Sequence, residues 1–236
     1  MSNGIKVKKR NGRGEEALNL DKMHLMVEEA TKGLAGVSAS QVEIQSGIQF
    51  YDGITTAEIQ EILIKSASDL IDLDHPNYQF VAARLLLFSI RKSLYGRTRE
   101  LPHLEDHIVK SVTQEVYDAG IYDKYSKEDI EKANGYIDHD RDFLFTFAGL
   151  RQVVDKYLVQ DRSTGQVYET PQFMYMMIAL TIFAEYPKEK RLNYVRRYYN
   201  AISKHKLNIP TPIMAGVRTP IRQFASCVLV DIDDTL

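Results

Sequence analysis

The sequence has few of the features that would narrow its class at once. Only one of its 236 residues, Cys227, is a cysteine, so the chain can form neither an internal disulfide nor a zinc site built from several cysteines. This usage fits the reducing cytoplasm, which is the location we expect. The formal net charge of −2 gives no reason to expect a nucleic acid or a membrane surface as a partner.

Long apolar runs are also missing. The longest, residues 173–184, is shorter than the roughly 20 residues that a membrane-spanning helix needs, and it predicts a buried core helix instead. Residues 1–12 are basic but lack the apolar core of a signal peptide. The remainder is an ordinary globular composition, 44% apolar and 26% charged, in a chain long enough for one large or two modest domains.

The N-terminal part predicts a β-hairpin over four short helices. Residues 5–20 form two short strand-like stretches around an Asn11-Gly12 turn. Thr55–Glu58 has the form of a capping box, and Gly96 is a typical helix end. A polar stretch with Pro102 marks the expected domain boundary. Helices are predicted at residues 23–32, from 38 or 40 to 50, 55–73 and 78–94.

Helical periodicity dominates from residue 103 onward. A turn at Ser163–Gly165 interrupts it with a hairpin-like break over residues 157–169. The prolines of residues 207–220 exclude a helix and favour extended chain. An apolar run at residues 226–230 predicts a short buried strand. Helices are predicted at about residues 104–118, 126–134, 138–155, 170–184 and 188–206, so the fold class is mainly α.

A basic turn near the N-terminus is the first candidate binding element. Lys9 and Arg10 lie at the hairpin turn, and Asn19 and Lys22 follow at the start of a helix. Cations beside a helix N-terminus suit a triphosphate, and the hydroxyl of Thr56 opens another helix that could meet the same anion. The alternative is a solvated basic hairpin with no ligand.

The stretch Ile137–Asp142 carries alternating carboxylates and a histidine. Such a pattern can bind a divalent metal. It can equally cap a helix, with Arg141 paired to a neighbouring carboxylate, and we prefer this second interpretation.

The C-terminal stretch offers two further readings. Cys227 is either a redox thiol beside a substrate anion or a buried inert cysteine, and dithiol chemistry would need a partner cysteine that the chain lacks. Residues 228–235 match the strand and Asp-x-Asp-x-Thr motif of haloacid-dehalogenase-like phosphatases. In those enzymes the motif opens the domain, and no residue follows Leu236 here, so we do not expect a phosphatase.

Five stretches, from three parts of the chain, together resemble the large (α) subunit of class I ribonucleoside-diphosphate reductase. PTPIMAGVRTPIRQFASCVL, residues 210–229, is similar to the first substrate-site segment of that subunit. VKKRNGRGEEALNLDK and IQFYDGITTAEI are similar to its N-terminal ATP-cone. YIDHDRD and KYLVQDRSTGQVYE resemble parts of the helical domain between them.

The resemblance implies three segments. Residues 1–96 would be the ATP-cone, a β-hairpin plus a four-helix bundle. Residues 97–220 would be the helical domain, and residues 221–236 the first strand of a ten-stranded α/β barrel. Because the family's large subunit is several times longer, we expect a C-terminal fragment of the same subunit on another chain to complete the barrel. We expect this chain to be inactive when isolated.

The resemblance also assigns site residues. Cys227 would be one of two thiols that reduce the ribose 2′ position, with Thr211 and Ser226 beside the substrate. Asp234, Thr235 and Leu236 would begin the specificity-effector site, and no residue is assigned to a metal. The ATP/dATP activity site would comprise Lys9, Arg10, Glu15, Glu16, Asn19, Lys22, Thr56 and Lys92.

Cofactors and partners follow from the same resemblance. No cofactor would be covalently bound; ATP or dATP, with Mg²⁺, would be the effector. The radical would come from a separate metal-containing small (β) subunit, and thioredoxin or glutaredoxin would be the reductant. The alternative function is a non-catalytic ATP/dATP-sensing interaction module.

Two departures bear on regulation. Gln60 and Ser89 stand where well-known dATP-inhibited members of the family have histidine, which weakens the expectation of dATP inhibition. The turn near Gly14 is one residue longer than in the family, so the position equivalent to Glu15 is uncertain by one residue.

Overall fold

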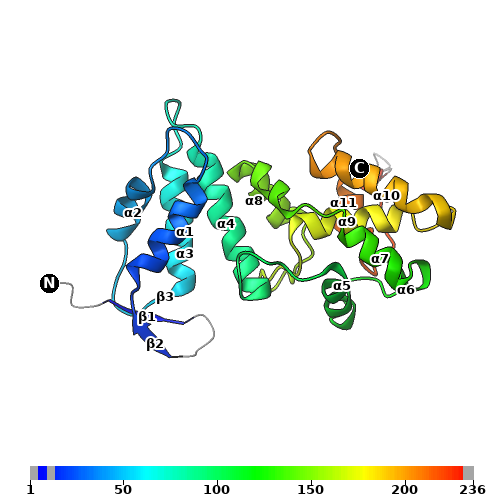
Figure 1. Ribbon diagram of the computed structural model, residues 1–236, viewed down its shortest axis with the longest axis horizontal. Coiled ribbons are helices and arrows are strands. Elements are labelled where there is room, and N and C mark those ends of the chain that lie inside the picture. The colour runs from blue at the N-terminus through cyan, green and yellow to red at the C-terminus, as the bar shows by residue number, and fades with distance from the viewer. Residues whose placement is uncertain (1–4, 10–13, 231–236) are drawn as a thin grey trace, which may run out of the picture. The chain divides into compact units, whose positions relative to one another are not determined.

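The computed structural model describes residues 5–9 and 14–230 of the chain. The chain divides into two compact units (Figure 1). The first comprises Met1–Leu101 and Asp142–Gln152, and the second comprises Pro102–Arg141 and Val153–Leu236.

A small mixed sheet belongs to the first unit. Strand β1 (Lys6–Lys8) lies between β2 (Glu15–Ala17) and β3 (Ile54–Thr55); it runs antiparallel to β2 and parallel to β3. The predicted hairpin is confirmed. The sequence did not predict β3, because a pair of residues is too short to show the alternation of a strand. Figure 1 shows the three strands together at one end of helices α1 and α3.

Four helices complete the first unit, as the sequence predicts: α1 (Leu20–Thr31), α2 (Ala39–Gly47), α3 (Thr56–Asp69) and α4 (Tyr78–Tyr95). The capping box is confirmed, since the side chain of Thr55 accepts from Glu58 N–H while Glu58 accepts from Thr55 N–H. Gly96 ends α4 in the left-handed region, with φ of 73°.

The start of α1 corrects one expectation. We predicted that strand-like chain would continue to Leu20 and that the helix would begin at Met23. Instead the Oδ1 atom of Asn19 accepts from the Lys22 N–H at 2.9 Å, and this N-cap starts the helix at Leu20. A cap that can be satisfied locally outweighs the weak strand signal of these residues.

The core of the first unit lies between α3 and α4. Leu63, Leu85 and Leu87 are fully buried, and each contributes about 1.5–3 kcal/mol by leaving water. A buried ion pair, Arg91 Nη2 to Asp142 Oδ2 at 2.9 Å, fastens the later part of the chain to α4 within this unit.

The second unit is helical. Its helices are α5 (Leu104–Thr113), α6 (Ile121–Lys124), α7 (Lys127–Asn134), α9 (Pro171–Ile182), α10 (Lys188–Ser203) and α11 (Thr211–Gly216). The 3₁₀-helix η1 (His139–Leu144) and helix α8 (Phe147–Lys156) each contribute residues to both units. The apolar run does form a buried helix, since Phe173 to Leu180 of α9 are all buried.

Other boundaries follow local backbone chemistry. The helix predicted over 104–118 ends at Thr113, and Glu115 adopts a φ of 57°, which an α-helix cannot contain. The predicted hairpin-like break is confirmed by the antiparallel bridge between Gln160 and Val167 and by Gly165 at φ 72°.

The expectation of extended chain throughout 207–220 is wrong. Helix α11 begins at Thr211 with Pro212 in its first turn, where a proline lacks only an N–H that would be unpaired anyway. Proline therefore starts this helix rather than preventing it.

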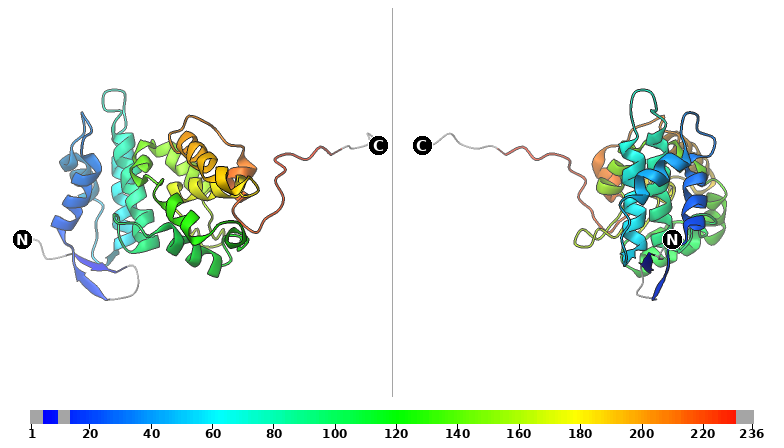
Figure 2. Two further views of the ribbon diagram at one scale, coloured as in Figure 1. Left: turned by 45° about the vertical axis from the view of Figure 1, so that its right-hand side comes forward. Right: turned by 90° about the vertical axis from the view of Figure 1, so that its left-hand side faces the viewer.

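The buried strand expected at 226–230 is also wrong for the chain as described. Residues 221–230 form no strand, and Val228 and Leu229 are 76% and 99% exposed. Figure 2 shows this stretch running away from the helices of its own unit. A strand needs a neighbour for its backbone N–H and C=O groups, and none of the described residues supplies one.

Candidate functional site

A cavity of about 180 Å³ lies in the first unit, beside the sheet and the starts of two helices. It is bounded by β1, β2, α1, α3 and the end of α4. The residues that line it are Val7, Glu16, Ala17, Leu18, Asn19, Lys22, Met23, Met26, Thr56, Ile59, Gln60 and Lys92.

Two helix N-termini meet at this cavity. Helix α1 contributes Asn19 and Lys22 from its first turn, and α3 contributes Thr56, its first residue. The first turn of a helix carries N–H groups without intrahelical acceptors and the positive end of the helix dipole. Asn19 and Thr55 each cap one of these N–H groups, and the remaining N–H groups with the two helix dipoles favour an anion.

Positive side chains strengthen this preference. Lys22 and Lys92 are exposed, and their side chains form no hydrogen bond or ion pair with any residue that the structure describes. Lys9 Nζ lies 2.8 Å from Glu16 Oε2. The hydrogen bond from Lys9, with the charges of Lys22 and Lys92, holds the pKa of the Glu16 carboxyl below its usual value.

Part of the cavity lining is apolar. Val7, Met23 and Ile59 are buried, and Met26 is half-buried. Such a surface suits the face of a planar base, because flexible methionines adapt to aromatic rings. The cavity thus combines a cationic side with an apolar side.

Gln60 is fixed at the inner end of the cavity. Its Nε2 donates to the Leu85 carbonyl oxygen of α4 at 3.0 Å. This bond holds the side chain of Gln60, which also lines the cavity. Ser89, the other departure from the family pattern, is half-buried and does not line the cavity.

The structure brings together most of the predicted activity-site residues. Glu16, Asn19, Lys22, Thr56 and Lys92 line the cavity, and Lys9 reaches it through its ion pair with Glu16. Glu15 is exposed on β2 and does not line the cavity. Arg10 lies outside the described residues.

Sequence reasoning missed the apolar wall. Met23 and Met26 are three residues apart on α1, and a helical reading of residues 20–31 would have placed them on one face. The helix predicted at 23–32 already contained both methionines, but their spacing alone does not show that the face they share lines a cavity.

The predicted substrate residues lie in the second unit and do not form a site there. Thr211 is exposed at the start of α11, with its Oγ1 3.5 Å from the Tyr157 hydroxyl. Cys227 is exposed, and its Sγ lies 4.0 Å from the Ser226 hydroxyl. Among the described residues no hydrogen bond joins Thr211 to Ser226 or Cys227. Asp234, Thr235 and Leu236 lie outside the described residues.

The carboxylate stretch has a structural role. Asp138 caps η1 by accepting from the Asp140 N–H at 3.2 Å, and Arg141 Nε donates to Asp138 at 3.1 Å. The preferred capping interpretation is confirmed. Over residues 5–9 and 14–230, no cluster of three or more acidic, histidine or cysteine side chains is arranged to hold a metal ion.

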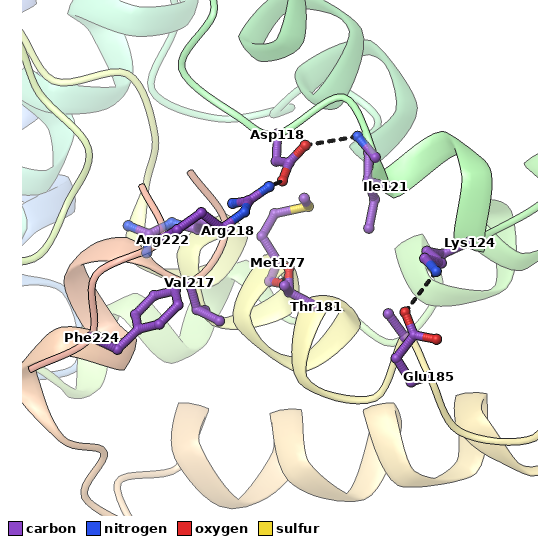
Figure 3. A pocket seen from close by; sticks show the side chains of 12 residues that line it. Asp118, Ile121, Lys124, Met177, Thr181, Glu185, Val217, Arg218, Arg222 and Phe224 are labelled. Carbon is purple, nitrogen blue, oxygen red and sulfur yellow. Dashed lines mark hydrogen bonds and ion pairs between the residues drawn. The ribbon is translucent and has the colours of Figure 1, made fainter. Parts of the chain in front are cut away.

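A second cavity, about 390 Å³, lies in the second unit (Figure 3). Asp118 and Lys124 on its rim are each paired, with Arg222 and Glu185 respectively (Figure 3). The N–H of Gly120 and the guanidinium of Arg222 hold the pKa of Asp118 below its usual value. Because these charges neutralise one another, the cavity has no evident ligand.

None of the described helices is long and apolar enough to cross a membrane.

Two family models match separate parts of the chain. A family model described as the ATP cone domain matches residues 5–93, and one described as the ribonucleotide reductase all-alpha domain matches residues 143–222. The chain is 50% identical over its whole length to ribonucleoside-diphosphate reductase subunit alpha of Haemophilus influenzae. It is also 50% identical to ribonucleoside-diphosphate reductase 1 subunit alpha of Escherichia coli.

A more distant relative is the ribonucleoside-diphosphate reductase subunit alpha of Enterobacteria phage T4, with 44% identity over 85% of the chain. The chain covers 31% of the length of the two bacterial relatives and 27% of the phage relative. The chain therefore contains an ATP cone domain followed by a ribonucleotide reductase all-alpha domain, and along its whole length it is similar to the N-terminal part of these alpha subunits.

Proposed function

We propose that the cavity of the first unit binds ATP or dATP, with Mg²⁺ on the triphosphate, as an allosteric effector. The observation that carries the proposal is the meeting of two helix N-termini and two lysines without partners among the described residues at one cavity. The triphosphate would lie against Lys22, Lys92 and the first turns of α1 and α3. The base would lie against Met23, Met26 and Ile59.

The wider proposal concerns the whole enzyme. The chain supplies the N-terminal part of a large subunit that reduces ribonucleoside diphosphates, with residues 1–96 as the ATP-cone and 97–220 as the helical domain. Residues 221–236 enter the barrel formed with the remainder of the subunit. Their exposed apolar side chains, Val228 and Leu229 among them, support this proposal, because an apolar stretch of this kind gains from burial against a partner.

In that assembly Cys227 is one of two reducing thiols. The pair gives two electrons and two protons to the substrate, the ribose 2′-oxygen leaves as water, and the two sulfurs form a disulfide. The second thiol comes from the remainder of the subunit. Thioredoxin or glutaredoxin then reduces the disulfide, and a separate metal-containing small subunit supplies the radical. Thr211 and Ser226 hold the substrate, and Asp234 to Leu236 begin the specificity-effector site. We expect the assembly in the cytoplasm.

Isothermal titration tests the nucleotide site directly. The chain should bind ATP at one site, and the double substitution of Lys9→Ala with Thr56→Ala should abolish the heat of binding. The matched control is Lys65→Ala, an exposed lysine of α3 paired with Asp69 away from the cavity. Unchanged ATP affinity in the double variant, or equal loss in the control, would refute the site.

The rival function is a nucleotide-sensing module without catalysis, and the same ATP cavity favours it. Cys227→Ser separates the two. With the remainder of the large subunit and the small subunit present, the serine variant should lose multi-turnover reduction of ribonucleoside diphosphates. Retained turnover would show that Cys227 is not a reducing thiol, and it would leave nucleotide sensing as the function of this chain.

A further inference from the structure

Arg218 is the largest fully buried side chain of the described residues, with 1% of its surface exposed. It belongs to the same segment as Thr211, whose side chain is exposed, and Arg222, which is also exposed. A long cation in such a segment would ordinarily remain in water, because burying a charge is unfavourable unless it is fully paired. Partners inside the protein must therefore stabilise the buried charge of Arg218.

The guanidinium of Arg218 is held by one carboxylate and two carbonyl oxygens. Its Nε lies 2.9 and 3.1 Å from the two oxygens of Glu169, and its Nη2 also donates to Glu169. Nη1 donates to the Met214 carbonyl at 2.5 Å, and Nη2 donates to the Tyr157 carbonyl at 2.9 Å. Such a set of bonds fixes the planar group in position and in orientation.

Glu169 is held from its other side. The Tyr117 hydroxyl donates to its Oε2 at 2.5 Å, and the Val159 N–H donates to its Oε1 at 2.7 Å. A phenol has one proton, and Tyr117 gives it to Glu169, so the His107 Nε2 at 3.0 Å must be the donor to the phenol oxygen. His107 in turn stacks on Phe173 of α9, with ring centres 4.2 Å apart.

The bonds of Arg218 connect separate parts of the second unit. Met214 belongs to α11, whereas Tyr157 follows α8. The Arg218 carbonyl itself accepts from the Asp118 N–H at 3.0 Å. One guanidinium thus sets the distance between α11 and the chain at Tyr157, and the hydroxyl of Tyr157 is the group that lies 3.5 Å from Thr211 Oγ1.

We propose that Arg218 is a positioning residue for the substrate segment: through Glu169 and the carbonyls of Met214 and Tyr157, it fixes helix α11 so that Thr211 is presented in a single orientation. The role of Thr211 rests on the proposed function, whereas the fixing of α11 does not. Buried ion pairs often add little net stability compared with apolar packing, so a positional role explains this pair better than a stabilising one.

The first arm of the test uses the chain alone. Arg218→Lys keeps the charge but loses the fork that spans Met214 and Tyr157. Amide hydrogen exchange of residues 211–219 should become faster by about tenfold or more, while the amides of α9 keep their rates. The matched control is Arg191→Lys, because Arg191 is also buried and ion-paired, with Asp129, but does not contact α11. This control should leave exchange in 211–219 unchanged.

The second arm uses the reconstituted enzyme. Arg218→Lys should raise the KM for ribonucleoside diphosphates by about tenfold with a smaller change in kcat, because it loosens substrate holding and leaves Cys227 intact. If the wild-type enzyme shows no reduction at all, the proposed function fails, and the exchange result still decides the positional role of Arg218.

Tyr117→Phe covers the case in which Arg218→Lys does not fold. It removes the bond to Glu169 and the acceptor of His107 with little change in shape, so the same local increase in exchange should appear at about threefold. Normal exchange in 211–219 for a folded Arg218→Lys or for Tyr117→Phe would overturn the proposal. So would a uniform increase over the whole second unit, which would mean that the pair only stabilises.

Discussion

The charged residues of the first-unit cavity and those of the buried Arg218 network have opposite environments. In the first unit, Lys22 and Lys92 are exposed at a cavity, and their side chains form no bond with a described residue. In the second unit, Arg218 and Glu169 are fully buried, and the protein itself supplies partners for both. The contrast distinguishes two uses of charge: lysines left without partners are available to a ligand, whereas a fully paired arginine holds the backbone in place.

The largest effect should come from breaking the buried pair. Glu169→Ala leaves the Arg218 charge buried without its carboxylate, and we expect the free energy of unfolding of the second unit to fall by about 3–5 kcal/mol. Urea unfolding, monitored by hydrogen exchange of the α9 amides, measures this loss of stability. Asp118→Ala removes the partner of the largely exposed Arg222. It should lower the free energy of unfolding of the second unit by only about 0–1 kcal/mol. Equal losses would remove the distinction between the two pairs.

A pH titration should produce the next largest effect. Burial lowers the pKa of His107 to about 3, against a usual value of 6.5. Between these values the unfolded chain binds a proton that the folded chain does not, so stability is lost as pH falls. We expect the free energy of unfolding to fall by about 2–3 kcal/mol from this group between about pH 7 and about pH 4.5.

The control for this titration is His107→Gln, whose amide can donate to Tyr117 but does not titrate. Thermal unfolding of the second unit should depend on pH less steeply in this variant than in the wild type. Identical slopes would contradict the buried neutral histidine.

On the first unit, Lys92→Ala should weaken ATP binding by about tenfold, because it removes a charge-assisted contact with the triphosphate. AMP binding should change less, since AMP carries a single phosphate group. Titration calorimetry with both nucleotides measures the difference, and Lys65→Ala again serves as the control. An equal effect on ATP and AMP would place Lys92 away from the outer phosphates.

The smallest effect separates the two roles of Asn19, which both caps α1 and lines the cavity. Asn19→Ala should lower the free energy of unfolding of the first unit by about 1 kcal/mol through loss of the cap. Asn19→Asp keeps the cap, so stability should be preserved while the added negative charge weakens ATP binding. If Asn19→Asp binds ATP as tightly as the wild type, Asn19 is only a cap.

The sequence predicted what local chemistry decides. The capping box at Thr55, the left-handed Gly96 and the turn at Gly165 each depend on neighbouring residues, and each was predicted. Helix α11 was not predicted, because the prolines of this segment were taken to exclude a helix. A proline in the first turn of a helix is permitted. The strand at 226–230 was misjudged because pairing depends on residues far away in the chain or outside it.

The nucleotide cavity and the Arg218 network also differ in how far the sequence predicts them. The basic turn and Thr56 pointed to the cavity because helix starts can be read from sequence. The pairing of Glu169 with Arg218 could not be predicted, since 49 residues separate them and no spacing rule links two such charges. A buried network of this kind is specified by tertiary packing alone.

The most direct test of the account is an amide NMR map of the whole chain with and without ATP and Mg²⁺. We expect shifts confined to the cavity of the first unit, at residues 16–23, 56–60 and 92, with no change at Glu169 or Arg218. Shifts centred on the cavity beside Asp118 and Arg222, or no shifts at any nucleotide concentration, would contradict it.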